Sequence, residues 1–168
     1  KLRYVSLPES LKEFGRYGAV FVDCPELVRV DVDKDNEYYY SNGQVLVDKR
    51  TKTIIDGWGT EICNAADFPK ELLPTRIGNN AFRKHSLLRY VILPATIESV
   101  GDGAFSGCKS LRQLNCHAVV PPVLGKDVFK HDEVNGIVLT PLQEQLNLLV
   151  PEASVEAYKN APGWKEFK

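Results

Sequence analysis

The segment Pro94-Ala-Thr-Ile-Glu-Ser-Val-Gly-Asp-Gly-Ala-Phe-Ser-Gly-Cys-Lys-Ser-Leu111 carries the pattern that decides the fold. Part of it also occurs earlier in the chain. Ile77-Gly-Asn-Asn-Ala-Phe82 matches Val100-Gly-Asp-Gly-Ala-Phe105, and Leu88 matches Leu111, each at an offset of 23 residues. Apolar, glycine, Ala-Phe and leucine positions that recur at one fixed offset indicate an internal repeat.

The start of the chain provides another copy of this unit. Leu2-Arg-Tyr-Val-Ser-Leu-Pro8 nearly repeats Leu88-Arg-Tyr-Val-Ile-Leu-Pro94, and Cys24 falls at the position of Cys108. This copy carries two extra residues after Gly15. The two copies therefore share one template, with a small insertion in the first.

The unit reads L-x-x-V-x-L-P-x-x-I-x-x-V-G-x-x-A-F-x-x-C-x-x-L. Its first six positions predict a short strand with alternate apolar residues pointing inward, and proline ends that strand because it cannot donate a ladder hydrogen bond. Gly15, Gly78 and Gly101 are expected to permit a tight turn, after which Ala-Phe begins a short helical or 3₁₀ segment. One unit cannot bury its own apolar face, so the units must stack into a solenoid.

The segment from Pro94 to Leu111 resembles the BspA-type leucine-rich repeat, whose signature is roughly I-P-x-x-V-x-x-I-G-x-x-A-F-x-G-C-x-x-L. Two further segments are similar to recurring pieces of such proteins, an inserted hairpin and a closing helix: Asp35-Asn-Glu-Tyr-Tyr-Tyr-Ser-Asn-Gly-Gln-Val-Leu-Val-Asp-Lys49 and Val150-Pro-Glu-Ala-Ser-Val-Glu-Ala-Tyr-Lys-Asn-Ala-Pro-Gly-Trp164. The resemblance implies a right-handed leucine-rich-repeat solenoid of short β-strands and short helical or 3₁₀ turns. It also implies a secreted or outer-surface protein of bacteria.

The repeat template predicts where the strands fall. Rung strands are expected near residues 2–7, 27–32, 63–68, 88–93, 111–116 and 146–150. A β-hairpin insert is expected at about 36–57 and a C-terminal cap at about 146–168, with a helix from Ser154 to Lys159. Residues 1–168 are read as one leucine-rich-repeat domain. Its first rung has no polar cap before it, so we expect the C-terminal part of a longer chain.

Composition and charge exclude several classes of function. The chain is 43 % hydrophobic and 26 % charged, with a formal net charge of −1. Such a balance provides no global field to hold nucleic acid, and no apolar run is long enough to span a bilayer. Neither an initiator Met nor a signal peptide is present, which suggests a processed or trimmed segment.

Four cysteines are present, and none forms a C-x-x-C pair or a zinc-ligand spacing. On the template, Cys63 and Cys116 take inward rung positions, and Cys24 and Cys108 share a turn position. We therefore expect four buried free thiols. The alternative is a disulfide between Cys108 and Cys116.

Catalytic and metal sites are not indicated. His85, His117 and His131 are scattered, and no nucleophile elbow accompanies them, so we expect no enzyme, no catalytic residue and no cofactor.

The alternating acidic run from Asp31 to Asp35 resembles the start of a calcium loop. Position six of such a loop would be Asn36 instead of Gly, and position twelve would be Asn42 instead of Glu. A solvated acidic edge is the favoured interpretation.

The outward rung positions give the candidate binding surface. Stacked strands lie about 4.8 Å apart, so these positions should form a continuous face with Arg in four rungs. Arg suits carboxylate or sulfate, and Tyr offers flat amphipathic contact. The candidate ligand-binding residues are Arg3, Tyr4, Arg29, Arg89, Tyr90, Arg112 and Gln113. The alternative is that Arg and Tyr serve solubility and cross-strand pairing here.

The run Tyr38, Tyr39 and Tyr40 is a second candidate surface, because exposed aromatic loops often carry recognition. Its alternative is that these tyrosines pack the hairpin onto the solenoid.

The sequence thus favours a non-enzymatic extracellular scaffold for adhesion or ligand capture. Its expected partner is a host or bacterial protein or a glycan. A structural spacer that presents another domain is the second hypothesis, and an enzyme is the weakest. Ligand identity and oligomeric state are left open.

Overall fold

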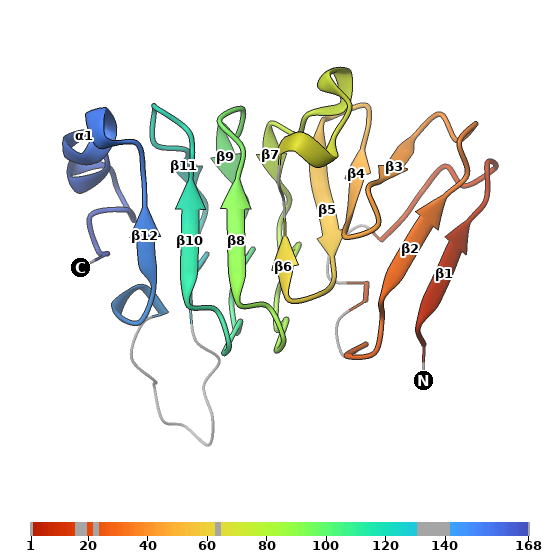
Figure 1. Cartoon of the computed structure of the whole chain (residues 1–168), viewed down its shortest axis with the longest axis horizontal. Helices are drawn as coiled ribbons and strands as arrows, with labels where there is room; N and C mark the ends of the chain where they lie inside the picture. Colours follow the sequence, from red (N-terminus) through yellow and green to blue (C-terminus); the bar gives the residue numbers. More distant parts are fainter. Residues whose placement is uncertain (1, 16–19, 22–23, 63–64, 131–141, 168) are drawn as a thin grey trace.

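The computed structural model of the chain describes residues 2–15, 20–21, 24–62, 65–130 and 142–167. The strands stand side by side along the long axis of the molecule, in two layers that enclose the apolar side chains (Figure 1). The chain is a β-solenoid of leucine-rich-repeat type, and its described residues form mostly short strands and one short α-helix, α1 (Val155–Asn160), near the C-terminal end.

The first layer contains the rung strands, and five of the six predicted ones are confirmed. They are β1 (Tyr4–Leu7), β2 (Arg29–Val32), β8 (Tyr90–Leu93), β10 (Gln113–Cys116) and β12 (Asn147–Leu149). Neighbouring rungs pair in parallel, with Leu114 opposite both Val91 and Leu148. This register keeps the apolar positions of successive units in one inward row, as the alternation predicts.

The strand predicted at 63–68 is wrong in position. The rung strand is β6 (Glu61–Ile62), which pairs with Tyr90 and Val91 of β8. Residues 65–67 form a 3₁₀ helix, η1 (Ala65–Asp67), and a second one follows, η2 (Lys70–Leu72). Because a short connection leads from the preceding strand directly into β6, this rung begins early, and the extra residues lie after it. Cys63 itself lies outside the described residues.

The second layer contains very short strands that the repeat template did not predict. These are β7 (Arg76–Ile77), β9 (Ser99–Val100) and β11 (Val123–Leu124), and they pair in parallel in that order. Each immediately precedes the glycine of its repeat: Gly78, Gly101 and Gly125. The V-G portion of the unit is therefore itself a sheet-forming element.

The insert is a three-stranded meander, and not the single hairpin that the sequence predicts. Strands β3 (Tyr39–Ser41) and β4 (Val45–Asp48) pair antiparallel, and β4 pairs antiparallel with β5 (Thr53–Gly57). On its other edge β5 pairs in parallel with β7. One strand thus joins the meander to the second layer of the solenoid.

The rung layer is interrupted where this meander enters. Strands β1 and β2 form a two-stranded sheet of their own, and β6, β8, β10 and β12 form a separate four-stranded sheet. The predicted continuous face is therefore wrong. The meander occupies the position where β2 would otherwise meet the next rung (Figure 1).

The interior is divided in the same way. A small core, which we call the N-terminal core, lies under β1, β2 and the meander. Its buried members are Leu7, Leu27, Val30, Tyr39, Leu46 and Trp58. The main core runs through the remaining rungs to the C-terminal cap.

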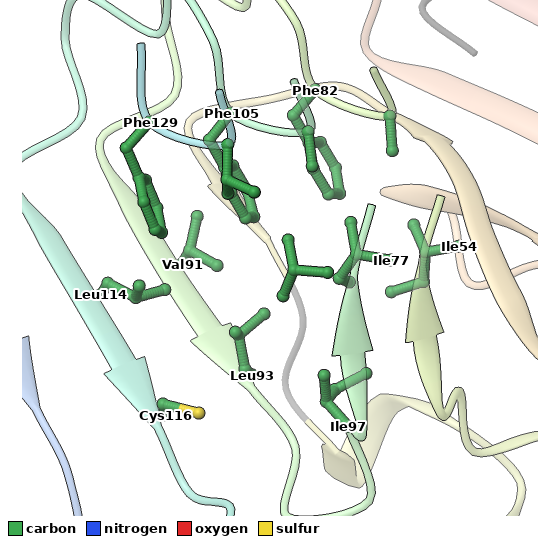
Figure 2. Packing of buried hydrophobic residues seen from close by; sticks show 14 of the residues in the cluster. Ile54, Ile77, Phe82, Val91, Leu93, Ile97, Phe105, Leu114, Cys116 and Phe129 are labelled. Atoms are coloured by element: carbon green, nitrogen blue, oxygen red, sulfur yellow. The ribbon is translucent and has the colours of Figure 1, made fainter. Parts of the chain in front are cut away.

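The main core contains a phenylalanine ladder at the Ala-Phe positions of the repeat. The rings of Phe82 and Phe105 stack with centroids 5.2 Å apart and planes 5° apart (Figure 2). Phe129 extends the ladder at 5.7 Å from Phe105, and the template missed it. Its signal is present in the sequence, since Gly125-Lys-Asp-Val-Phe129 matches the pattern of Gly101 to Phe105 at an offset of 24.

The C-terminal segment closes the ladder with aromatic side chains. Trp164 lies edge-on to Phe129, and Phe167 lies edge-on to Phe129 as well. The Trp164 indole donates from Nε1 to the carbonyl of Pro122 at 2.7 Å. Apolar rings and a satisfied indole donor cover the open end of the solenoid, as a terminal repeat requires.

Candidate binding surfaces

The outer face of the four-stranded rung sheet is the broader of the two candidate strand surfaces. Its side chains follow from alternation along each strand, since every second residue points away from the core. One outward row contains Glu61, Tyr90, Gln113 and Asn147, which are opposite one another in register. The next row contains Ile92, Asn115 and Leu149.

Four predicted site residues lie on or next to the strands of this sheet. They differ in whether their side chains are already engaged in hydrogen bonds. Arg89 and Tyr90 are exposed neighbours. The Arg112 guanidinium instead donates to the carbonyls of Lys109 and Leu111, at 3.0 and 2.9 Å. The Gln113 amide donates to Asn115 at 2.9 Å. Arg89 and Tyr90 are thus the pair best placed for a ligand.

The other three predicted residues lie on the separate two-stranded sheet. Tyr4 is 64 % exposed, and Arg29 is its register partner on β2. The Arg3 guanidinium lies 5.8 Å from the centroid of the Tyr4 ring. Arg29 pairs with Asp31 at 2.6 Å. The predicted set therefore forms two groups, one on each sheet.

A shallow groove of about 520 Å³ lies at the interruption of the rung layer. It is lined by Val28 and Arg29, by the β3–β4 turn, and by Asp67 of η1. Asn42 and Gly43 form that turn, and the Asn-Gly pair does signal a tight hairpin turn in the sequence. The sequence therefore predicts the turn itself, but only the tertiary structure places it against Val28, Arg29 and Asp67.

The tyrosine run is not an exposed surface. Tyr39 is only 3 % exposed and belongs to the N-terminal core, while Tyr38 and Tyr40 are half-buried. The Arg50 guanidinium lies 5.0 Å from the Tyr38 ring centroid and 5.5 Å from that of Tyr39. The alternative, in which these tyrosines pack the insert onto the solenoid, describes the structure better.

The described cysteines are free thiols at inward positions. Cys108 is buried, and its Sγ donates to the carbonyl of Phe82 at 2.9 Å. Cys116 is buried opposite Leu93, and Cys24 is half-buried beside the N-terminal core. The disulfide between Cys108 and Cys116 is therefore not formed in this structure.

The structure describes two of the three histidines, His85 and His117. Burial lowers the pKa of the half-buried His85, while His117 is exposed and His131 lies outside the described residues. Across the described ranges, no group of three or more His, Cys, Asp or Glu side chains could hold a metal ion.

The acidic side chains at residues 31–35 interact with nearby groups of the same segment. Asp31 pairs with Arg29, and Asp35 pairs with Lys34 at 2.7 Å. Asp33 accepts the backbone N–H of Asp35 at 2.9 Å. These carboxylates therefore serve separate partners on the surface.

Among the described helices, none is both long and apolar enough to cross a membrane.

Comparison with known proteins gives one family match. A family model described as a BspA type leucine rich repeat region matches residues 64–143 with 6 copies. Curated proteins give no significant match.

Solved structures of bacterial proteins are also similar. A leucine rich cell surface protein from Faecalibacterium prausnitzii A2-165 is 20 % identical with a TM-score of 0.55, over 94 % of this chain and 40 % of that one. A leucine-rich repeat protein from Eubacterium ventriosum ATCC 27560 is 18 % identical with a TM-score of 0.45, over 89 % and 48 %. The pneumococcal vaccine antigen PcpA is 18 % identical with a TM-score of 0.45, over 92 % and 52 %. The chain thus spans about half or less of each structure, and the likeness concerns the fold.

Proposed function

This chain carries a BspA-type leucine-rich repeat region, and from that premise we propose that it is a non-enzymatic binding scaffold on the bacterial surface or in the secreted space. Its partner would be a protein or a glycan that carries acidic groups. A solenoid suits this role because stacked strands present a rigid, extended surface whose outward side chains are not needed for the core.

The observation that carries the proposal is the exposed pair formed by Tyr90, on the outer face of β8, and Arg89, which immediately precedes that strand. Both side chains are exposed, and Tyr90 is flanked in register by Glu61 on one side and Gln113 on the other. The guanidinium fork of Arg suits carboxylate or sulfate, and the Tyr ring offers apolar contact with a polar tip. Acidic protein segments and acidic glycans are therefore the favoured ligands.

The experiment is a binding screen of the full chain against arrays of glycans and host proteins, followed by two matched double variants. Arg89→Ala with Tyr90→Ala removes the pair on the four-stranded sheet. Arg3→Ala with Tyr4→Ala removes the equivalent pair on the two-stranded sheet. We expect the first variant to abolish binding of the captured ligand and the second to retain it.

Both variants should remain folded, since exposed substitutions typically change stability by within about 0.5 kcal/mol. Binding should also weaken with salt, because exposed charges are screened over roughly 8 Å at physiological ionic strength. Equal binding by the wild type and the Arg89/Tyr90 variant would move the site elsewhere. If no array ligand is captured, the structural spacer becomes the better description.

A further inference from the structure

The two turns that lead into β8 and β10 carry a local excess of positive charge. The first spans residues 82–89 and the second spans residues 105–112. Neither segment contains Asp or Glu, although the whole chain has 22 acidic residues against 21 Lys and Arg. The cations of the two segments, which we call the basic patch, are Arg83, Lys84, Arg89, Lys109 and Arg112. The remainder of the chain therefore has a clear acidic excess.

Backbone hydrogen bonds hold these two turns side by side. Near their start, the N–H of Lys84 donates to the carbonyl of Ser106 at 2.7 Å. At their end, the N–H of Arg112 donates to the carbonyl of Arg89 at 3.0 Å. Both turns lie at the same edge of the solenoid, where β8 and β10 begin (Figure 1). Since every side chain of the basic patch is exposed, the fold gathers these charges on one surface.

Like charges are thus neighbours with little to neutralise them. Arg89 and Arg112 occupy the same position of consecutive repeat units, about 4.8 Å apart along the solenoid, and like charges on neighbouring strands repel each other. The Arg112 guanidinium donates to the carbonyls of Lys109 and Leu111, which are uncharged. Among the described residues, no ion pair joins Arg83, Arg89 or Lys109 to a carboxylate. A ligand with several negative charges would relieve this repulsion.

We propose that the basic patch binds a linear anionic polysaccharide, whose chain runs across the turns from one repeat to the next. This inference rests on the proposed function and names its ligand class, because Arg89 belongs to both surfaces. A polysaccharide with a sulfate or carboxylate on each repeating unit carries charges at regular intervals, as the stacked turns carry cations. Arg forks match both anionic groups, and Lys adds a flexible positive charge.

The residues among the cations suit a sugar ring. Ser86 and Leu87 are exposed in the first turn, and Tyr90 is 43 % exposed directly after Arg89. A pyranose ring has hydroxyl groups at its edge and C–H groups on its face, so it can contact a hydroxyl, an aliphatic side chain and an aromatic ring together. A flexible acidic peptide, by contrast, would lose more conformational freedom on binding. A polysaccharide is therefore favoured over an acidic peptide.

The test is calorimetric titration of the full chain at about 50 mM salt, where exposed charges are weakly screened. The probes are dextran sulfate, with dextran as its uncharged match, and polygalacturonate, with its methyl ester as the uncharged match. We expect saturable binding of both polyanions and none of the neutral chains. Affinity should fall steeply with salt, because a linear polyanion releases condensed counterions when cations bind it.

Two double variants with the same change in net charge locate the polyanion. Arg83→Ala with Lys109→Ala removes one cation from each turn and should weaken binding roughly fivefold to tenfold, the range for two exposed ion pairs. It should also reduce the salt dependence. Lys70→Ala with Lys159→Ala removes exposed cations of η2 and α1, at the opposite edge of the solenoid, and should change neither (Figure 1). Circular dichroism should show both variants folded.

An acidic neighbour allows a test in the opposite direction. Glu61 lies in register with Tyr90, and the adjacent Thr60 carbonyl accepts the N–H of Arg89. The Glu61 charge should repel a polyanion bound at the basic patch. Glu61→Gln should therefore strengthen polygalacturonate binding about twofold. Unchanged or weaker binding would count against the patch.

Absence of saturable binding of both polyanions would overturn the basic patch, and binding that survives Arg83→Ala with Lys109→Ala would place the polyanion elsewhere. Equal affinity for polyglutamate or duplex DNA would overturn the assignment to a polysaccharide. Failure of the patch remains distinct from failure of the proposed function. An array ligand that requires Arg89 and Tyr90, but neither Arg83 nor Lys109, would keep the proposed function and refute the patch.

Discussion

At Gly101, two neighbouring turns of the solenoid come so close that a side chain cannot fit between them. A Cβ added there would lie 2.6 Å from the backbone nitrogen of Asn79 and 2.7 Å from the carbonyl carbon of Gly78. Gly103 and Gly107, by contrast, have φ of +61° and +73°, and these are the glycines that turn the chain. Glycine thus serves two different needs within one repeat, close stacking and left-handed backbone.

The residue after the stacking glycine ties one turn to the next. The Asn79 side chain accepts the backbone N–H of Asp102 at 2.8 Å, and Asp102 in turn accepts that of Lys126 at 2.7 Å. Short amide or carboxylate side chains suit this task because they reach a backbone donor one rung away. The N-N and D-G pairs of the repeat are therefore part of its hydrogen-bond ladder.

The thiols give a prediction at this scale. Cys24 is half-buried, and Cys108 and Cys116 are buried, with burial raising the pKa of Cys116. Because the thiolate is the reactive form, a thiol reagent should label the half-buried Cys24 first and the buried Cys116 slowly. Peptide mapping by mass spectrometry reads the order of labelling. All cysteines should react after denaturation without reductant, and two unreactive ones would reveal a disulfide.

Asp56 gives a second prediction, in pH dependence. Burial raises the pKa of this carboxyl to about 6 from its ordinary 3.8, despite the backbone N–H groups that it accepts. The folded chain therefore holds this proton more tightly than the unfolded chain. The resulting stabilisation is complete below pH 3.8 and is lost as pH rises through about 6.

Wild type should thus gain roughly 2 kcal/mol over Asp56→Asn between pH 7 and pH 4, measured by denaturant melts. Asp48→Asn is the control with the opposite sign. Burial raises the pKa of Asp48, but the hydrogen bonds and charge of Arg50 outweigh it and lower the pKa overall. Wild type should therefore lose stability relative to Asp48→Asn as pH falls. A flat difference for Asp56→Asn would contradict the buried carboxylate.

Among the elements, the phenylalanine ladder holds the turns of the main core in line. Phe105 is fully buried between Phe82 and Phe129. Phe105→Ala should lower the free energy of unfolding by about 3–5 kcal/mol in a denaturant melt, as for other buried aromatic residues. Phe105→Leu keeps most of the volume and should cost clearly less. A loss below about 1 kcal/mol for alanine would contradict the ladder as a stabilising element.

The second structural element that matters is β5, since it belongs to both the meander and the solenoid. Its first residues pair with β7, and its whole length pairs with β4. Gly57 ends it against Phe82, where a Cβ would collide with the ring. β5 is thus the strand that joins the meander to the second layer, while Val45 and Val47 of β4 also pack in the main core.

For the whole molecule, the division into two cores predicts that a core substitution at one end increases local unfolding at that end only. In solenoids each repeat contacts only its neighbours, so a destabilising substitution lowers the stability of the adjacent repeats and not of distant ones. Trp164→Ala removes the cap from Phe129 and should raise hydrogen exchange of backbone amides in β10, β11 and β12. Amides of β1 and β2 should keep their protection.

Leu27→Ala is the mirror-image control, because Leu27 belongs to the N-terminal core. It should expose β1 and β2 to exchange while β10 and β12 stay protected. Uniform loss of protection along the chain in both variants would show that the solenoid unfolds as one unit, and would refute the separation.

The sequence by itself determined whatever depends on short-range periodicity. The L-x-x-V-x-L alternation located five of the rung strands, and the A-F positions located the ladder from Phe82 to Phe105. The closing segment with its helix was also predictable, because proline and glycine at Pro162 and Gly163 stop it. Each of these signals is contained within one repeat, where side-chain alternation and backbone preference act over a few residues.

Only the tertiary structure decided where the rungs meet. The register of β6 depends on where the chain re-enters the solenoid after the meander, and that point is set by the pairing of β5 with β7. The same long-range pairing places Arg29 and Arg89 on separate sheets. Strand pairing couples residues that are distant in sequence, and no local pattern encodes which edge a strand will find.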